Sequence, residues 1–414
     1  MGNPAQIAHR LNRSICLSSG QSDYEKIVDD ASQTRKWIDH NIEHHPELFP
    51  PEISKGYRMK DIKRSKKLAV TIRRIEVDGV AYTIRPSFVM PYMTEWTKDA
   101  ESALFLRKFD VPYWGISQIL GKDPMHWHRL ENSIGRNSIV GTTVKDPDKL
   151  PEHVAADEKH TKILGTKVYG ATTVGDECIL GASIAPEANE KSLTKAYRIF
   201  KDEAANIDPD YRPKTVNLDG WLATNLSWKS LFPLTVIISC ILHVFIKIRD
   251  RGRKKHKAIF DVLAEKFWDA YHAENKRTFT QRIRRLHEWA LKSNVPETLF
   301  KPIEKLREKV KNFSKAYDHP GAHRTSNMLD RLMQRMDRRL VSAQYFHGTI
   351  ESAELGIRAW ALIYNFAPSN PRTVKKYEGR KSPAERLNGF AYSESWLENL
   401  LVSASLGGYR QASP

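Results

Sequence analysis

Three aspartates stand where a protein can present carboxylates to a ligand. Asp157 ends a short segment with a strand-like pattern, and Asp219 ends the predicted strand Thr215–Leu218. Asp330 lies in the first turns of a predicted arginine-rich helix, Thr325–Ser342. Carboxylate oxygens are the ligands that hard cations require, and two such ions roughly 3.5–4 Å apart commonly activate water and stabilise a leaving oxygen on phosphate. The three acids therefore predict a site for two divalent ions, Mg²⁺ or Mn²⁺, that acts on phosphate esters.

Each acid also has an ordinary structural explanation. Asp157 could be a surface acid beside Glu158, and Asp219 could simply form the Asp-Gly turn with Gly220. Asp330 near a helix N-terminus is favoured by the helix dipole. The three acids in this order are much harder to explain as coincidence than any one of them alone.

The segments that must position these acids have an α/β pattern. We expect strands at His153–Asp157, Lys167–Thr173, Glu177–Ala185 and Thr215–Leu218, with a helix at Lys191–Ala204. Two or three antiparallel strands, a helix and a further strand predict a mixed sheet covered by helices. From about residue 251 to 317 helical periodicity replaces the strand pattern, which predicts a basic, all-helical insertion. A further helix is expected at Ile350–Phe366.

The apolar run Leu231 to Ile248, with its trailing basic residues, imitates a membrane span. Pro233 breaks its start and Lys247 interrupts its end, so we predict a buried strand, about Leu234 to Ser239, that leads into a helix. A membrane helix is the alternative. The run also contains Cys240-x-x-His243, and one thiol with one imidazole is too few for a closed structural zinc site.

Upstream, the pattern is helix, break, helix, turn, helix, at Ser102–Phe109, Tyr113–Leu120 and Met125–Ile134. Short helices joined by a turn that contains Gly121 suit a helix-turn-helix, whose last helix would offer His126, His128 and Arg129 to DNA. An ordinary helical bundle is an equally good explanation.

The N-terminal part combines polar helical segments with a hairpin around Asp78-Gly79, between Val70–Val77 and Val80–Arg85. His40, His44 and His45 fall close together on a helix. Because no carboxylate or cysteine clearly completes a metal-binding set, solvent-facing histidines are the favoured interpretation.

The composition favours a globular protein with an anionic partner. The chain has 414 residues, and 66 Lys and Arg against 49 Asp and Glu give a net charge of +17. A polyanion such as nucleic acid would exploit this excess, although a generically basic protein would also have it. Three widely separated cysteines suit a reducing cytoplasm rather than a disulfide framework.

Together, several of these features resemble one family. Asp157, Asp219-Gly220-Trp221, Cys240-x-x-His243, the helical insertion and Thr325-Ser326-Asn327-x-x-Asp330 resemble the DDE transposases of prokaryotic insertion sequences, which are related to Mutator-like transposases. The resemblance spans about residues 150 to 366. It implies an α/β fold with a ribonuclease-H-like mixed sheet, an all-helical insertion and a preceding helix-turn-helix region.

The resemblance also implies roles for individual residues. Asp157, Asp219 and Asp330 would be catalytic and would ligate two Mg²⁺ or Mn²⁺ ions, with Cys240 and His243 as site support. Four arginines of the third-acid helix would contact DNA phosphates: Arg331, Arg335, Arg338 and Arg339. The partners would be double-stranded DNA, at the ends of the transposable element and at the target, and further copies of the same chain. The protein would act on the nucleoid in a prokaryotic cytoplasm, with no membrane attachment.

One position departs from the family pattern. The third acid is usually glutamate, whereas this sequence has Asp330, one methylene shorter; Asp337 and Glu351 are weaker candidates because neither follows the Thr-Ser-Asn lead-in. The alternatives to a transposase that cleaves and joins DNA are therefore a transposase-derived DNA-binding protein without cleavage activity and a structure-selective nuclease on the same core.

These expectations divide the chain into six segments. They are an N-terminal helical and hairpin region (1–97), a helix-turn-helix region with a linker at Ile139–Leu150 (98–150), a first part of the catalytic core (151–250), the helical insertion (251–318), a second part of the core (319–366) and a C-terminal tail rich in Pro, Ser and Gly (367–414).

Overall fold

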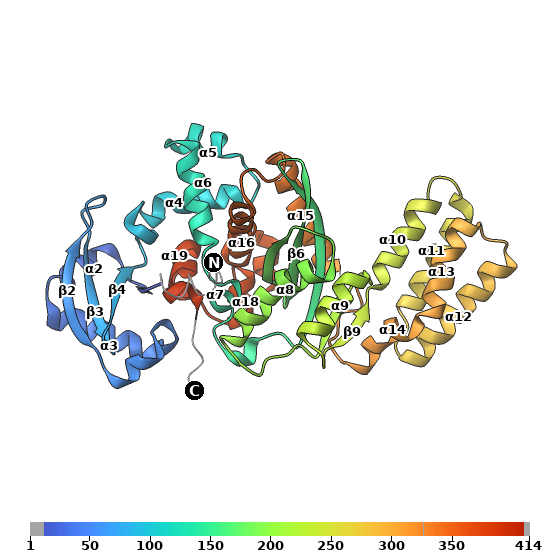
Figure 1. The fold of residues 1–414 in the computed structure, drawn as a ribbon, viewed down its shortest axis with the longest axis horizontal. Helices are drawn as coiled ribbons and strands as arrows, with labels where there is room; N and C mark the ends of the chain where they lie inside the picture. The colour runs from blue at the N-terminus through green and yellow to red at the C-terminus, as the bar shows by residue number, and fades with distance from the viewer. Residues whose placement is uncertain (1–11, 326, 410–414) are drawn as a thin grey trace.

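The fold is mixed α/β, with two separate sheets and a cluster of helices at one end of the molecule (Figure 1). The computed structural model describes residues 12–325 and 327–409, without the side chains of residues 327 and 328. The four-stranded sheet lies at the left of Figure 1, the five-stranded sheet near the centre, and helices α10–α14 at the right. Within the described residues, no helix has the length and apolar character that a membrane span requires.

The central sheet has the strand order β7-β6-β5-β8-β9. Its strands are β5 (His153–Ile163), β6 (Thr166–Gly175), β7 (Cys178–Ala185), β8 (Thr215–Leu218) and β9 (Val236–Ser239). The pairs β5–β6 and β6–β7 are antiparallel, whereas β5–β8 and β8–β9 are parallel. The predicted mixed sheet is thus confirmed. β5 is longer than predicted, because its hairpin with β6 continues to Ile163↔Thr166, so Asp157 lies within the strand rather than at its end.

Helices cover both faces of this sheet, and the alternation of side chains along β5 assigns each residue to a face. Val154 and Ala156 pack in the cluster that contains α8 (Glu190–Ala205) and α9 (Leu222–Leu231). Ala155 packs in the cluster that contains α15 (Asn327–Ser342) and α16 (Ile350–Phe366). By the same alternation Asp157 shares the face of α15, and Glu158 shares the face of α8 and α9.

The apolar run 231–248 forms β9 followed by α10 (Ile241–Gly252), so the predicted strand-to-helix path is confirmed. Beyond it lie α11 (Lys257–Tyr271), α12 (Lys276–Lys292), α13 (Glu297–Glu308) and α14 (Val310–Ser314). These helices share a hydrophobic core of their own with α10, which includes Phe267, Ile283 and Leu299. The predicted all-helical segment is therefore present.

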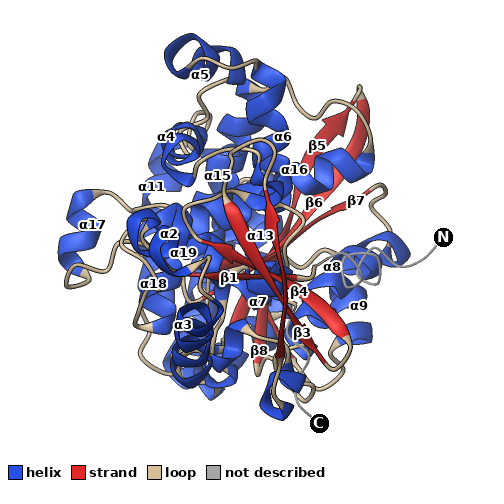
Figure 2. Cartoon of the chain, turned by 90° about the vertical axis from the view of Figure 1, so that its left-hand side faces the viewer, coloured by secondary structure: helices blue, strands red, loops and turns tan. Residues whose placement is uncertain are grey.

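The N-terminal sheet has the order β1-β4-β3-β2, and Figure 2 labels its strands β1, β3 and β4. The predicted hairpin is confirmed as β3 (Thr71–Val77) and β4 (Val80–Pro86), and the sheet gains β1 (Ser14–Leu17) and β2 (Arg58–Arg64). Helices α2 (Gln21–Ile27) and α3 (Ala31–His44) precede β2. The expected helix-break-helix-turn-helix appears as α4 (Thr97–Arg107), α5 (Tyr113–Leu120) and α6 (Pro124–Ile134).

The expected linker at Ile139–Leu150 is wrong in its first half. Residues Ile139–Thr143 form helix α7, all of whose residues are buried. Its apolar side chains pack on the sheet, and Gly141 lies so close to the chain at Gly408 that an added Cβ would come within 1.7 Å of the Gly408 carbonyl oxygen. The segment is therefore part of the core, because burial of its apolar side chains stabilises the folded protein more than exposure to solvent would.

The C-terminal tail folds back onto the core and the N-terminal sheet. It contains α17 (Pro371–Lys376), α18 (Pro383–Asn388) and α19 (Trp396–Ser403). Leu397, Leu400 and Leu401 of α19 are buried in the same cluster as Ile15 and Leu17 of β1. Long-range packing therefore orders a segment whose composition is typical of loops.

Candidate active site

Strand register brings the first two predicted acids to neighbouring positions. In the parallel pair β5–β8, Val154 is opposite Val216 and Ala155 is opposite Asn217. Two residues further along the chain are Asp157, within β5, and Asp219, directly after the end of β8. Since adjacent strands lie about 4.8 Å apart, this register places both acids on the same face and the same edge of the sheet.

The third acid reaches this edge because the loop before α15 is tied to β5 and β8. The Asn217 side-chain amide donates to the His323 carbonyl oxygen at 2.9 Å, and the His153 ring donates from Nε2 to the Pro320 carbonyl oxygen at 3.0 Å. α15 then begins beside β5 and carries Asp330 over the face that Asp157 shares. Ser326 of the Thr-Ser-Asn lead-in lies outside the described residues.

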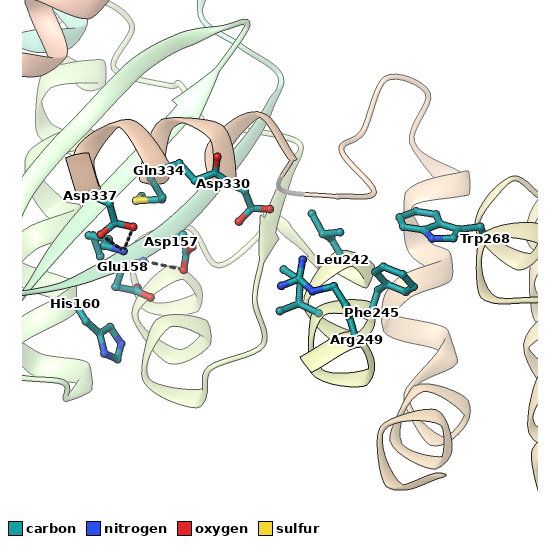
Figure 3. Close-up of a pocket in the computed structure, with 13 residues that line it drawn as sticks. Asp157, Glu158, His160, Leu242, Phe245, Arg249, Trp268, Asp330, Gln334 and Asp337 are labelled. Carbon is teal, nitrogen blue, oxygen red and sulfur yellow. Dashed lines mark hydrogen bonds and ion pairs between the residues drawn. The ribbon is translucent and has the colours of Figure 1, made fainter. Parts of the chain in front are cut away.

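Asp157, Asp330 and His243 form a compact cluster. Each offers one ligand atom, and these atoms lie within 4.8 Å of one another. Figure 3 shows Asp330 on its helix facing Asp157 on the strand below. The two acids line a pocket of about 450 Å³, to which α10 and α11 contribute Arg249 and Trp268.

His243 was expected only to support the site, yet it belongs to the carboxylate cluster itself. The Cys240 amide donates to the Leu218 carbonyl oxygen at 2.7 Å, which fixes the start of α10, the helix after β9, beside the end of β8. His243 lies in the first turn of that helix. Its ring is hydrogen-bonded to the side chain of Cys240, the residue that precedes the helix.

Asp219 is close to the cluster but is not one of its three members. Its Oδ1 accepts a hydrogen bond from the Trp221 amide at 2.7 Å across a turn in which Gly220 has φ +96°. Its negative charge nevertheless contributes to raising the pKa of Asp157. The structure therefore brings all three predicted acids to one edge of the sheet, with Asp157 and Asp330 closest.

Burial and charge give the cluster unusual proton affinities. Burial raises the pKa of Asp157 to about 6; the positive charge of His243 opposes this shift, and Asp219 and Asp330 add to it. Burial lowers the pKa of His243, but the hydrogen bond to Cys240 and the negative charges of Asp157 and Asp330 outweigh burial and raise it to about 9. Near neutral pH His243 is therefore a cation beside the carboxylates.

The donor set fits a divalent cation. Asp157 and Asp330 supply carboxylate oxygens, and Asp219 lies at the same edge, which is the oxygen-rich environment that Mg²⁺ and Mn²⁺ prefer. His243 could join the ligands only after it loses its proton, because a metal-bound imidazole is neutral.

Glu158 has a different environment from Asp157, on the opposite face of β5. Its Oε1 accepts hydrogen bonds from the Tyr197 hydroxyl of α8 at 2.6 Å and the Thr224 hydroxyl of α9 at 2.7 Å. Burial raises its pKa to about 7, against the opposing effect of these two hydrogen bonds. Glu158 thus connects the strand that carries Asp157 to α8 and α9 behind the sheet. In the sequence, the only indication of this role is that Glu158 directly follows Asp157.

Neither of the two weaker candidates for the third acid belongs to the cluster of Asp157, His243 and Asp330. Asp337 lines the same pocket, but it is paired with Lys159 of β5 at 2.6 Å. Glu351 is exposed in the first turn of α16 and does not line the pocket. Asp330 is therefore the acid of α15 that lies nearest to Asp157.

The four arginines of α15 do not share one environment. Arg331, Arg335 and Arg338 are exposed, and the Arg335 guanidinium lies 5.4 Å from the centre of the Tyr364 ring. Arg339 was expected to contact phosphate, but its side chain is only 10% exposed and pairs with Glu131 of α6. The helix therefore presents three arginines, not four, to a ligand.

Glu131 is a buried acid that sequence reasoning missed. Its Oε2 accepts hydrogen bonds from Arg107 Nε at 2.7 Å and from the Tyr113 hydroxyl at 2.8 Å, while its Oε1 accepts from Arg339. One carboxylate thus links α4, α5, α6 and α15. The sequence around Glu131 does not distinguish it from an ordinary solvent-exposed acid on a helix. Its partners Arg107, Tyr113 and Arg339 come from other helices.

Of the three α6 residues that were expected to contact DNA bases, one has an exposed side chain without an intramolecular hydrogen-bond or ion-pair partner among the described residues. Arg129 is exposed. His126 Nε2 lies 3.4 Å from a carboxylate oxygen of Glu95, and His128 is half-buried beside Asn132 and the Tyr113 ring. Trp127 and Leu130 face the core. The expected helices form, but intramolecular contacts occupy the histidines of α6.

Comparisons with known proteins add no assignment to this geometry. No protein-family model matches the chain, and no curated protein matches it.

Proposed function

We propose that the protein is a metal-dependent DNA transposase of an insertion-sequence type, with a ribonuclease-H-like core. The observation that carries this proposal is the cluster of Asp157 on β5 and Asp330 on α15, with Asp219 just beyond the end of the neighbouring parallel strand β8. The sequence resemblance names Asp157, Asp219 and Asp330, and two of these acids, Asp157 and Asp330, belong to the structural cluster.

The site residues divide the work of phosphoryl transfer. Asp157, Asp219 and Asp330 would hold the divalent ions, which supply charge stabilisation and an activated oxygen nucleophile. Asn217 and His153 hold the loop that sets the position of Asp330. The phosphodiester at an element end would be hydrolysed, and the freed 3′-hydroxyl would then attack target DNA in line, without a covalent protein intermediate.

The basic surface supports DNA as the substrate. Arg331, Arg335 and Arg338 are exposed on the helix that carries Asp330. Guanidinium groups at such positions would contact backbone phosphates, which orients a duplex without reading its sequence. Arg129 of α6 is the candidate for base recognition.

The decisive experiment measures cleavage and joining of DNA that carries the flanking inverted repeats, with Mg²⁺ or Mn²⁺. We expect wild-type protein to cleave and join, and Asp157→Asn and Asp219→Asn to abolish cleavage while DNA binding persists. Asp330→Asn should behave in the same way, whereas the exposed control Glu351→Gln should keep wild-type rates. Equal cleavage rates for wild type and Asp219→Asn would contradict the assignment of Asp219 to the catalytic site.

The same assay separates the alternatives. Cleavage without joining identifies a structure-selective nuclease. Binding without cleavage identifies a transposase-derived DNA-binding protein, and cleavage restored by Asp330→Glu would then trace the loss to the shorter third acid. Loss of cleavage in Asp337→Asn but not in Asp330→Asn would transfer the third role to Asp337.

A further inference from the structure

A second group of potential metal ligands lies on α3 of the N-terminal region, remote from the carboxylate pocket (Figure 1). His40, Glu43 and His44 are exposed, and their ligand atoms lie within 4.8 Å of one another. Residues at positions i, i+3 and i+4 of a helix project from the same face, so the backbone itself holds the three side chains together. Glu43 supplies the carboxylate that sequence reasoning did not find for these histidines.

A hydrogen bond sets the tautomer of one ligand. His44 Nδ1 lies 2.9 Å from the His40 carbonyl oxygen, and a carbonyl oxygen only accepts, so Nδ1 carries the proton. The lone pair of the neutral ring is therefore on Nε2. Metal-binding histidines characteristically donate their other ring N–H to a carbonyl or carboxylate, which fixes the ring and raises its basicity.

The surroundings also favour a cation. These residues lie in the last turns of α3, where the unpaired carbonyl groups of a helix end carry partial negative charge. The His40 and His44 ring centres are 4.1 Å apart, so both imidazoles lie at one place on the surface. His45 is not part of the set, because its Nδ1 lies 3.3 Å from Glu47.

We propose that His40, Glu43 and His44 form a binding site for a transition-metal dication, with water completing the coordination. Two imidazoles and one carboxylate suit Zn²⁺, Ni²⁺ or Cu²⁺ and disfavour Mg²⁺, which prefers oxygen ligands. A bound ion bridges residues of the last turn of α3 and restrains the end of this helix. The site is independent of the proposed DNA chemistry, since none of its residues comes from the central sheet or α15.

The test is a Zn²⁺ titration of the full chain by isothermal calorimetry, in an Asp330→Asn background that disables the carboxylate pocket. We expect one Zn²⁺ per chain, loss of this binding in the double variant His40→Ala/His44→Ala, and a decrease in affinity of about tenfold or more in Glu43→Gln. His347→Ala, which removes an exposed histidine of another segment, should bind as the background does.

A second readout uses Co²⁺, whose visible absorption reports the ligands directly. The background protein should show a Co²⁺ spectrum that His40→Ala/His44→Ala lacks, while circular dichroism confirms that the variant, altered only at exposed side chains, remains folded. Unchanged Zn²⁺ stoichiometry and affinity in the folded double variant would overturn the proposal, as would equal losses in His347→Ala.

Discussion

At the scale of single residues, the most consequential contact is the buried carboxylate of Glu131. It is completely buried and faces two arginines, Arg107 and Arg339, whose side chains are 6% and 10% exposed. A buried charge is tolerated only when it is paired and hydrogen-bonded, and here both carboxylate oxygens are engaged. Because Arg339 belongs to the helix that carries Asp330, Glu131 also helps to position the third acid.

We predict that Glu131→Gln lowers the free energy of unfolding by about 3–5 kcal/mol, because both arginines lose their counter-charge inside the protein. Urea denaturation of the variant and wild type measures this loss. The matched control is Glu297→Gln, which removes an exposed carboxylate paired with Lys301 and should leave stability unchanged within error. Equal stability of wild type and Glu131→Gln would show that the pair contributes nothing net.

Glu131 also predicts how stability depends on pH. Burial alone would raise its pKa, but the charges and hydrogen bonds of Arg339 and Arg107 outweigh burial and lower it to about 2, from an ordinary value of 4.5. A lowered pKa in the folded state means that this stabilisation is fully present above about pH 4.5 and is lost as the pH falls toward 2. Wild-type protein should therefore lose more stability over this interval than Glu131→Gln, and parallel profiles would contradict the assignment.

At the scale of elements, the close crossing of α6 and α16 depends on one glycine. A Cβ at Gly135 would lie 2.0 Å from the Leu355 carbonyl oxygen, so any side chain pushes the two helices apart. Gly135 itself has φ −64°, which every residue adopts, so the requirement is for space and not for backbone freedom. The crossing matters because α16 supports the sheet face that carries the site.

We predict that Gly135→Ala destabilises the protein by about 1–3 kcal/mol or more, because main-chain atoms cannot give way as a flexible side chain would. The matched control is Gly115→Ala in α5, where the nearest atom would be at an ordinary 3.5 Å. There the alanine should stabilise the helix by about 0.5–1 kcal/mol. Thermal or urea denaturation of both variants measures the contrast, and a neutral Gly135→Ala would mean that the helices are not in such close contact.

At the scale of the whole molecule, the net charge of +17 predicts salt-sensitive DNA binding. Each phosphate that the protein neutralises releases counterions, so the logarithm of the binding constant should fall linearly with the logarithm of salt concentration. The exposed arginines of α15 are the side chains that we expect to contribute most, since they lie beside the candidate site.

We predict that Arg331→Ala/Arg338→Ala reduces the magnitude of the salt-dependence slope by about 2, as the loss of two phosphate contacts requires. Fluorescence anisotropy at several salt concentrations measures the slope. Arg372→Ala/Arg380→Ala removes the same charge from exposed positions of the C-terminal segment and should leave the slope near the wild-type value. Equal slopes for both double variants would show that net charge alone, and not α15, determines binding.

The sequence by itself determined the local structure where periodicity was strong. β8, α5 and α16 form with the predicted bounds, and β6, β7 and α8 form within two residues or fewer of them at each end. Alternation along strands and helical spacing reflect backbone geometry within one segment, so they can be recognised without knowledge of the fold. The resemblance pointed to Asp157 and Asp330, which the structure brings together with His243.

Only the tertiary structure decided which side chains meet. It placed His243 among the carboxylates, buried Arg339 against Glu131, and converted the expected linker into the buried helix α7. It also completed the histidine pair of α3 with Glu43. These outcomes depend on register, on loop paths and on the packing of segments distant in sequence, and the identities of local residues do not specify such contacts.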